Sequence, residues 1–191
     1  MRPWSSGGAD GSAVEFEPDL AAALGRKLGV RFRFEHASFD QLLPGLKAKK
    51  FDVVVAGMTD TKKRQLGNSG AFSARNQVAF LDYFTSGSSL VVREGNPRRI
   101  DEPGDLCGRT VAVQRATTQV DFMAQQVTNC LTRGEKAPTV VEGDTNGETL
   151  DLVGAGTADV QITDTPAALY SVRCVDSDRR YEAEGPSAPA L

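Results

Sequence analysis

The sequence predicts an α/β protein built as two lobes, each a mostly parallel sheet flanked by helices, which extended hinge strands join. Helix and strand patterns alternate in residues 17–57, and the same alternation returns in residues 110–170. Between these halves, residues 78–84 and 88–94 have the pattern of two extended segments around a Thr-Ser-Gly turn.

These extended segments set the expected boundaries of the lobes. Lobe 1 is expected over residues 1–85 and lobe 2 over residues 86–182, with a first hinge segment at 85–90. A second crossing is expected near 180–185, and the tail 183–191 would then return to lobe 1. A length of 191 residues leaves room for two small domains of this kind.

Lobe 1 begins with a helix pattern over EPDLAAALGRKLGV, in which leucine recurs every fourth residue. Pro18 suits the first turn of this helix, and Gly29 stands where a C-terminal glycine cap belongs. A strand is expected at 30–36, followed by a helix that Asp40 can cap and by a continuous apolar strand at 51–57.

Lobe 2 repeats this order of helices and strands. Strands are expected at 110–114, 138–142 and 158–163, and helices at 118–130 and 145–153. A short helix with Pro166 in its first turn follows the last strand.

A weak internal repeat links the two lobes, because residues 42–61 and 149–165 both run helix, turn and strand and end in Thr-Asp-Thr. Ligands bind beyond the carboxyl ends of parallel strands, so both triplets should lie at the edge of a cleft. Helix capping is an equally good reading of either triplet alone.

The composition excludes several classes of protein. A net charge of −3, from 22 basic and 25 acidic residues, argues against a nucleic-acid binder. No apolar run approaches the roughly 18 residues of a membrane span, and the N-terminus has no apolar core of a signal peptide.

The one histidine, His36, lies in an alternating segment that favours a surface position, and the three cysteines lack the spacing of a zinc site. Since nucleotide, protease and hydrolase motifs are also absent, we expect no metal, no cofactor and no enzymatic activity.

Five segments, taken in order, resemble one protein family. They are FEPDLAAALGRKLGV, FDQLLPGLKAKKFDVVVAGMTDTKKR, YFTSGSSLVV, DLCGRTVAVQRATTQ and GTADVQITDTPAALY, and they extend over about residues 16–172. This pattern is similar to that of family 3 of the bacterial extracellular solute-binding proteins, in its amino-acid-binding branch that serves ABC transporters.

The resemblance implies the type II periplasmic binding protein fold, whose two lobes close like a clam shell on an amino acid, here a polar or cationic one. It implies an extracytoplasmic protein, periplasmic or a cell-surface lipoprotein, whose partner is the permease of an ABC transporter. The membrane would be reached only through the transporter or through an N-terminal lipid anchor missing from this chain. Two alternatives stay open: a ligand-sensing module of a receptor, and a dehydratase-like catalytic variant of the fold.

In lobe 1 the resemblance assigns four residues to the ligand. Arg64 matches the arginine that clamps the ligand α-carboxylate, because a guanidinium donates two parallel hydrogen bonds to a carboxylate. Gly57 and Thr59 match positions that offer a backbone carbonyl and a hydroxyl, and Phe39 matches an apolar position lining the cleft. A solvated helix face is the alternative for Arg64. Turn chemistry suits Gly57 and Thr59 equally well, and core packing suits Phe39 nearly as well.

In lobe 2 the resemblance assigns three residues. Thr117 and Thr118 match a threonine pair that opens a helix, where hydroxyls and backbone N–H groups would receive the carboxylate. Asp164 matches the acidic residue that pairs with the ligand α-ammonium, since a buried cation needs a counter-charge. Plain N-capping is the alternative for the threonines, and a favourable charge at a helix N-terminus is the alternative for Asp164.

The chain departs from the family pattern in several places. Ala116 replaces the usual glycine before the threonine pair, which puts the role of Thr117 in doubt, and Glu15 replaces another glycine. Residues 66–76 have the character of an extra loop. We also expect a chain truncated at both ends: it would begin after the family's first strand and bind ligand weakly or not at all, with lobe 2 the better-ordered half.

The cysteines are expected to include one disulfide. Cys107 precedes the first strand of lobe 2 and Cys130 ends the helix after that strand, and this placement resembles paired cysteines of some exported members of the family. An oxidising exterior permits such a bond, which leaves Cys174 unpaired.

Overall fold

The computed structural model describes residues 6–7, 13–14, 16–66, 77–175 and 180–188. The chain divides into two compact units, Met1–Leu81 and Asp82–Leu191, and each is described here by itself. The division falls slightly before the lobe boundary expected at 85/86. The expected extra loop 66–76 lies almost entirely outside the described residues.

The described residues of the first unit form three helices, α1 (Phe16–Leu28), α2 (Phe39–Lys47) and α3 (Lys62–Gln65), and a two-stranded pair of β1 (Ser6–Gly7) with β2 (Ala13–Val14). The predicted first helix is confirmed as α1, with acidic residues in its first turn and basic residues in its last, as the helix dipole favours. Gly29 takes a φ of 70° directly after α1, which is the left-handed conformation of a C-terminal glycine cap.

Two expected strands of the first unit are wrong. Residues 30–36 and 51–57 are irregular, and no ladder among the described residues includes them. An apolar run indicates burial, but a strand also needs a neighbouring segment that exchanges backbone hydrogen bonds with it. The expected cap of α2 is also wrong by position, because Ser38 is the N-cap residue and Asp40 lies inside the first turn.

Few apolar side chains are buried in the first unit. Among its described aliphatic and aromatic side chains only Pro18 and Ala21 are buried, whereas Leu28 is 67% exposed and Val53 51% exposed. One tight contact holds α2, because a Cβ added to Gly45 would lie 2.3 Å from the ring of Phe51. His36 is exposed, as expected.

The second unit is an α/β layer structure in which the predicted strands and helices are confirmed within two residues at most of their ends. Its strands are β3 (Ser88–Arg93), β4 (Thr110–Gln114), β5 (Thr139–Gly143), β6 (Val160–Asp164) and β7 (Tyr181–Ala188). Its helices are α4 (Thr118–Thr132), α5 (Asn146–Gly154) and α6 (Thr165–Tyr170), with the short helical turns η1 (Pro103–Leu106) and η2 (Ser171–Val175). Pro166 lies in the first turn of α6, as predicted.

The strand order of the second unit is β5-β4-β6-β3-β7. β4 runs parallel to β5 and β6, whereas β3 runs antiparallel to β6 and β7, so the sheet is mixed rather than mostly parallel. Parallel neighbouring strands are joined by a crossover connection such as a helix. Because β3 is the first strand of this sheet along the chain, no crossover from another of its strands leads into β3. The expected return of the tail to lobe 1 is wrong for residues 183–188, which belong to β7 and pair with β3.

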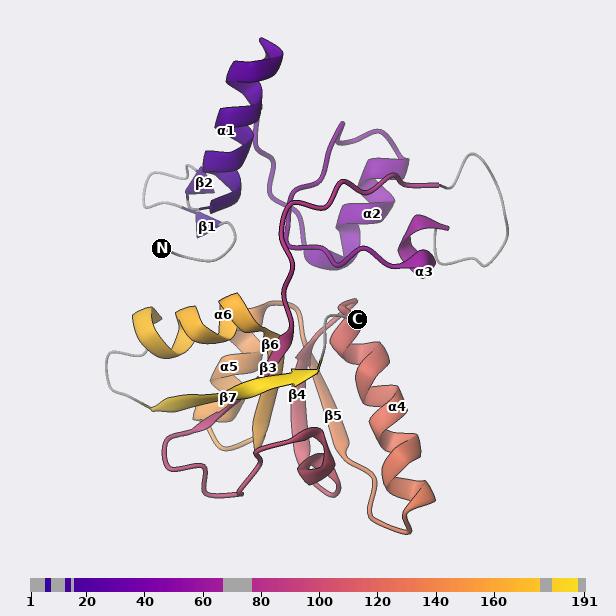
Figure 1. The fold of residues 1–191 in the computed structure, drawn as a ribbon, viewed down its shortest axis with the longest axis vertical. Coiled ribbons are helices and arrows are strands. Elements are labelled where there is room, and N and C mark those ends of the chain that lie inside the picture. The colour runs from indigo at the N-terminus through magenta and orange to yellow at the C-terminus, as the bar shows by residue number, and fades with distance from the viewer. Residues whose placement is uncertain (1–5, 8–12, 15, 67–76, 176–179, 189–191) are drawn as a thin grey trace. The chain divides into compact units, whose positions relative to one another are not determined.

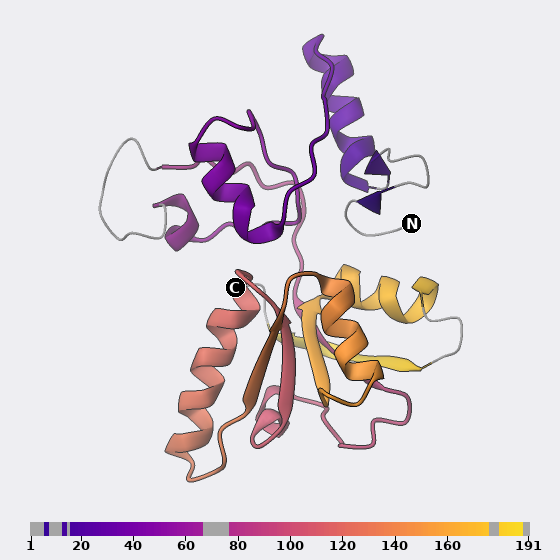
Figure 2. The same ribbon diagram turned by 180° about the vertical axis from the view of Figure 1, so that it is seen from behind.

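Both faces of this sheet are covered, as alternation along each strand requires (Figures 1 and 2). One face packs against α4 and η1 through a core that includes Leu90, Val111 and Met123. The other face packs against α5 and α6 through Val91, Ala112 and further residues. Nearly all the buried apolar side chains of the described chain therefore belong to the second unit.

A disulfide joins Cys107 to Cys130, with a Cα–Cα distance of 5.6 Å, as the resemblance implied. It ties the loop after η1 to the last turns of α4. Cys174 lies in η2, but its side chain falls outside the part that the structure describes. No helix of the described residues is long and apolar enough to cross a membrane.

Candidate functional site

Arg64 is a buried arginine held by its own unit. Its side chain is only 6% exposed although it follows two lysines, so the solvated helix face considered for it is wrong. Its Nη1 donates to the backbone carbonyl of Thr59 at 2.7 Å, and its guanidinium carbon lies 5.6 Å from the centroid of the Phe39 ring. The structure thus brings together three of the four ligand-binding residues predicted for lobe 1.

The first Thr-Asp-Thr triplet positions Arg64. Thr61 is the N-cap of α3, and its hydroxyl accepts a hydrogen bond from the backbone N–H of Arg64 at 3.2 Å. The carboxylate of Asp60 accepts from the amide of Gln65 at 2.8 Å. Helix capping is therefore one role of this triplet, and the cap fixes the position of the Arg64 backbone.

Gly57, the fourth predicted residue, contacts an acidic residue that sequence reasoning missed. The backbone N–H of Gly57 donates to Oε1 of Glu17 at 2.6 Å, and Glu17 is only 1% exposed. Gly57 also has a φ of 55°, a conformation that glycine adopts readily. The signal for Glu17 was weak, because an acidic residue in the first turn of a helix is ordinary.

In the second unit, Asp164 lies at the carboxyl end of β6 and is the N-cap residue of α6. Its side chain makes no capping hydrogen bond, although its position at the start of α6 is compatible with the alternative of a favourable charge at a helix N-terminus. Instead, Oδ1 of Asp164 accepts from Nε2 of Gln119 at 2.9 Å. Gln119 was not predicted, and the same amide nitrogen also donates to Oγ of Ser88 at 3.1 Å.

The threonine pair Thr117 and Thr118 lies at the start of α4, but the hydroxyl of Thr117 does not cap the helix as plain N-capping would require. Thr117 is the N-cap residue, yet its hydroxyl points back and donates to the carbonyl of Gln114 at 2.6 Å, so it does not cap the helix. Thr118 begins α4 and is 9% exposed. Ala116, which precedes the pair, has a φ of 61°, a left-handed conformation that strains an ordinary residue and that glycine adopts readily.

Thr165, which completes the second triplet, ties α6 to the segment that enters the second unit. Its backbone N–H and its hydroxyl both donate to the carbonyl of Gly87, at 2.8 and 3.0 Å. Its hydroxyl also lies 2.9 Å from that of Ser89. Asp164 is thus anchored at the point where the crossing segment becomes β3.

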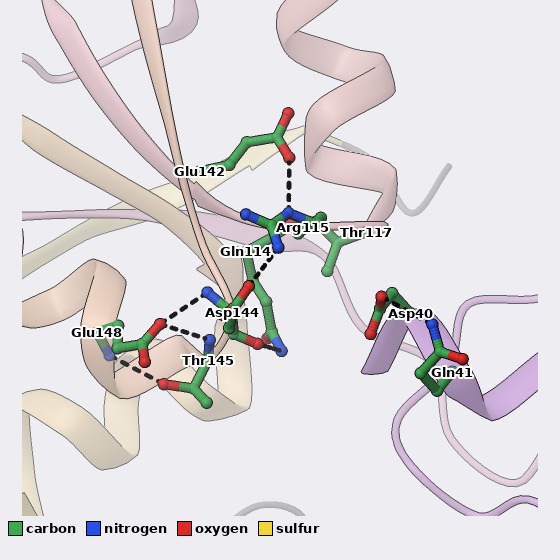
Figure 3. Close-up of polar contacts among 9 residues, drawn as sticks. All are labelled: Asp40, Gln41, Gln114, Arg115, Thr117, Glu142, Asp144, Thr145 and Glu148. Atoms are coloured by element: carbon green, nitrogen blue, oxygen red, sulfur yellow. Dashed lines mark hydrogen bonds and ion pairs between the residues drawn. The ribbon is translucent and has the colours of Figure 1, made fainter. Parts of the chain in front are cut away.

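A group of charged side chains lies beside Thr117, at the carboxyl ends of β4 and β5 (Figure 3). Arg115 donates to Asp144 at 2.5 Å and lies 3.6 Å from Glu142. Thr145 and Glu148 form a reciprocal capping box at the start of α5. All these side chains are largely exposed, so the ion pairs add little stability but set the charge of this edge.

No group of three or more His, Cys, Asp or Glu residues that could bind a metal occurs among the described residues. The predicted residues of the first unit include a guanidinium, and those of the second unit include a carboxylate and the start of a helix. Such groups recognise charged polar molecules.

Comparison with known proteins identifies the family. The sequence profile of the bacterial extracellular solute-binding proteins, family 3, matches residues 1–171. The chain belongs to this family.

One curated family relative is the arginine-binding protein ArgT of Corynebacterium glutamicum, which is 26% identical over 184 residues, covering 96% of this chain and 56% of ArgT. A solved structure of an ancestral arginine-binding protein bound to arginine has a TM-score of 0.83 at 30% identity, covering 99% of this chain and 77% of the other. An ancestral amino-acid-binding protein, AncCDT-1, a precursor of cyclohexadienyl dehydratase, has a TM-score of 0.78 at 28% identity, covering 100% and 76% of the two chains.

These similarities confirm the predicted fold class, that of the type II periplasmic binding proteins. The chain spans about half the length of the curated relatives that it matches.

Proposed function

We propose that this protein binds a free amino acid outside the cytoplasm, a cationic one such as arginine in preference, and delivers it to the permease of an ABC transporter. One observation carries the proposal: the unit containing Arg64 offers a buried cation, and the unit containing Asp164 offers a carboxylate. A free amino acid presents the complementary pair at neutral pH, an α-carboxylate and an α-ammonium.

Arg64 is proposed to receive the α-carboxylate. The carbonyl of Thr59 orients its guanidinium, and a guanidinium carries five N–H donors in a planar fork that matches a carboxylate. Low exposure strengthens such a charge pair, because less water screens it. Thr59 and Gly57 would add polar contacts, and the ring of Phe39, which already lies against Arg64, would pack on the ligand side chain.

Asp164 is proposed to receive the α-ammonium, and the start of α4 at Thr117 and Thr118 to add hydrogen bonds to the carboxylate. The hydroxyl of Thr117 donates backwards, to Gln114, and so does not cap the first N–H groups of this helix. A ligand carboxylate would give these groups an acceptor.

The mechanism follows from placing the two charges on separate units. A ligand that binds Arg64 and Asp164 together stabilises only arrangements in which both contacts form, so binding would favour a closed form by differential affinity. The proposed hinge is segment 85–90. Because Thr165 holds Gly87, the movement would concentrate before Gly87.

The preference for a cationic ligand is supported by the relatives, which are arginine-binding proteins by name. Family membership supports an extracytoplasmic location and a permease partner. A catalytic variant is the second candidate, because AncCDT-1 is a precursor of a dehydratase. That candidate requires turnover, whereas a transport protein binds its ligand and releases it unchanged.

The test is a melting-temperature screen of the folded protein with each of the twenty amino acids, followed by calorimetry. A ligand that binds only the folded state raises the melting temperature, and we expect the largest rise with L-arginine. Agmatine, which is arginine without its α-carboxylate, should bind at least roughly tenfold more weakly. Recovery of L-arginine unchanged after incubation would exclude the catalytic candidate for this ligand.

Matched variants sharpen the screen. Asp164→Asn keeps the shape of the side chain and removes its charge, so it should lose binding, whereas Asp151→Asn, on the exposed side of α5, should not. The proposal fails if none of the twenty amino acids raises the melting temperature at millimolar concentration. Delivery is tested separately: loaded protein should stimulate ATP hydrolysis by its transporter in proteoliposomes.

A further inference from the structure

Gln119 is a buried amide that joins three elements of the second unit. It lies in the first turn of α4 and is only 6% exposed. Its Nε2 donates to Oδ1 of Asp164 at 2.9 Å and to Oγ of Ser88 at 3.1 Å. Ser88 and Asp164 are paired opposite each other in the β3–β6 ladder. One side chain of α4 therefore contacts the last paired position of two neighbouring strands.

The chemistry of an amide suits a carboxylate that must remain charged. The NH₂ group of glutamine has two N–H donors, and here one acceptor is the carboxylate and the other a hydroxyl. A neutral donor fixes the orientation of a carboxylate without cancelling its charge, whereas an arginine or lysine there would neutralise it. Gln119 therefore holds Oδ1 of Asp164 in place without itself cancelling the charge of the carboxylate.

Burial makes this arrangement specific. Because Gln119 is nearly inaccessible, its amide rather than bulk water occupies the donor position beside Asp164. Ser88 helps to hold the amide, and Ser89 beside it contacts Thr165, the residue that follows Asp164. The orientation of the Asp164 carboxylate is therefore set from α4 and β3 as well as by its own strand.

We propose that Gln119 is a positioning residue that holds the carboxylate of Asp164 in the orientation that receives a primary ammonium group. This inference rests on the proposed function, in which Asp164 binds the α-ammonium of an amino acid. Gln119 acts through Asp164, so its loss should weaken the recognition of the ammonium more than the recognition of the rest of the ligand.

The test compares two ligands in one set of variants. L-arginine carries an α-ammonium, and 5-guanidinopentanoate is the same molecule without it. Gln119→Leu keeps most of the side-chain volume and removes the donor, and Gln119→Glu places a second carboxylate against Asp164. Gln125→Leu is the matched control, since Gln125 lies on the same helix and is exposed. Affinity is measured by calorimetry or, for weak ligands, by ligand-observed NMR competition.

Gln119→Leu should weaken L-arginine binding roughly tenfold or more and change 5-guanidinopentanoate binding less than about twofold. Gln119→Glu should weaken L-arginine binding by no less than Gln119→Leu, and Gln125→Leu should leave both affinities unchanged. A merely structural role would lower both affinities by the same factor. Equal losses for the two ligands, or no loss for L-arginine, would overturn the inference.

A second measurement needs no ligand. The side-chain amide resonances of Gln119 in ¹⁵N-labelled protein should shift as Asp164 titrates, and this shift should disappear in Asp164→Asn. A missing shift overturns the contact itself. If the shift is present but the wild-type protein binds none of the twenty amino acids, the proposed function has failed and the positioning role falls with it. If the wild-type protein binds L-arginine, the ligand comparison decides on Gln119 alone.

Discussion

The backbone carbonyl of Thr59 accepts a hydrogen bond from Nη1 of Arg64 at 2.7 Å, so the start of the loop before α3 sets the direction of the arginine at its end. Thr61, between them, caps the helix and accepts from the backbone N–H of Arg64. Backbone and side chain of the arginine are thus each fixed by one residue of the same Thr-Asp-Thr triplet. These two hydrogen bonds restrict the side-chain conformation of the buried arginine.

Replacing Arg64 separates its charge from its geometry. Arg64→Ala should abolish binding of L-arginine, because removing a charged hydrogen-bond partner from a desolvated site costs about 2–5 kcal/mol. Arg64→Lys keeps a positive charge but loses the planar fork, so it should bind measurably but at least roughly tenfold more weakly. Calorimetry gives the affinities, and circular dichroism shows whether each variant is folded. Unchanged affinity in a folded Arg64→Ala variant would sink the assignment.

Ala116 should be a site where glycine stabilises the protein. Its φ of 61° is left-handed, a conformation that costs an ordinary residue roughly 1–2 kcal/mol. Ala116→Gly removes this strain, partly offset by the greater freedom of the unfolded chain, and should raise the free energy of unfolding by about 1 kcal/mol. Ala124→Gly, at an exposed position within α4, should lower it by about 1 kcal/mol. Urea unfolding of both variants checks the opposite signs.

The second unit was predicted well because its elements are specified locally. Helices α4 and α5 and strands β4, β5 and β6 follow one another with short connections, so hydrophobic period and turn residues sufficed to place them. The direction of β3 and the partner of β7 depend on pairing between segments about ninety residues apart. Such pairing is a tertiary choice that a local pattern does not encode.

The candidate site was likewise predicted only in part from the sequence. Arg64, Thr59 and Asp164 were predicted from motifs that resemble those of the family. The two residues that the resemblance missed, Glu17 and Gln119, are defined by what they contact far along the chain, Gly57 and Asp164. An acidic residue or a glutamine in a first helical turn is too common to indicate a role, and only the fold shows that both side chains are buried.

The pairing of β7 with β3 can be tested at Gly154. The hydroxyl oxygen of Tyr181, which opens β7, would lie 2.3 Å from a Cβ added to Gly154. Tyr181 is 4% exposed, so Gly154→Ala must displace it and should destabilise the protein by about 1–3 kcal/mol. Gly147→Ala, on the same helix, meets only ordinary contact with Thr145 and should stabilise by up to about 1 kcal/mol. If both variants had the same sign of effect in urea unfolding, Tyr181 would not pack on α5.

The Cys107–Cys130 disulfide should contribute stability by restricting the unfolded chain. It joins residues 23 positions apart, and closing a loop of that size contributes about 3 kcal/mol. The double variant Cys107→Ala/Cys130→Ala should therefore unfold at lower urea concentration, and dithiothreitol should move the wild-type transition toward the same value. Dithiothreitol should leave the double variant unchanged, which controls for effects of the reductant elsewhere. If dithiothreitol left the urea midpoint of the wild-type protein unchanged under denaturing conditions, the disulfide would be contradicted.

Stability should be distributed unequally between the two units. Among described aliphatic and aromatic side chains, the first unit buries only Pro18 and Ala21, and the other buried ones lie around the five-stranded sheet of the second unit. Burial of apolar surface is the main favourable term in folding, and local opening is easiest where few such contacts must be broken. Backbone amides of β3, β4 and β6 should therefore exchange with deuterium most slowly, and those of α1 and α2 much faster. Residue-resolved exchange measures this, with the same protein in denaturant giving the unprotected rates. Equal, strong protection of α2 and β4 would show that the first unit is stabilised by more than its described side chains provide.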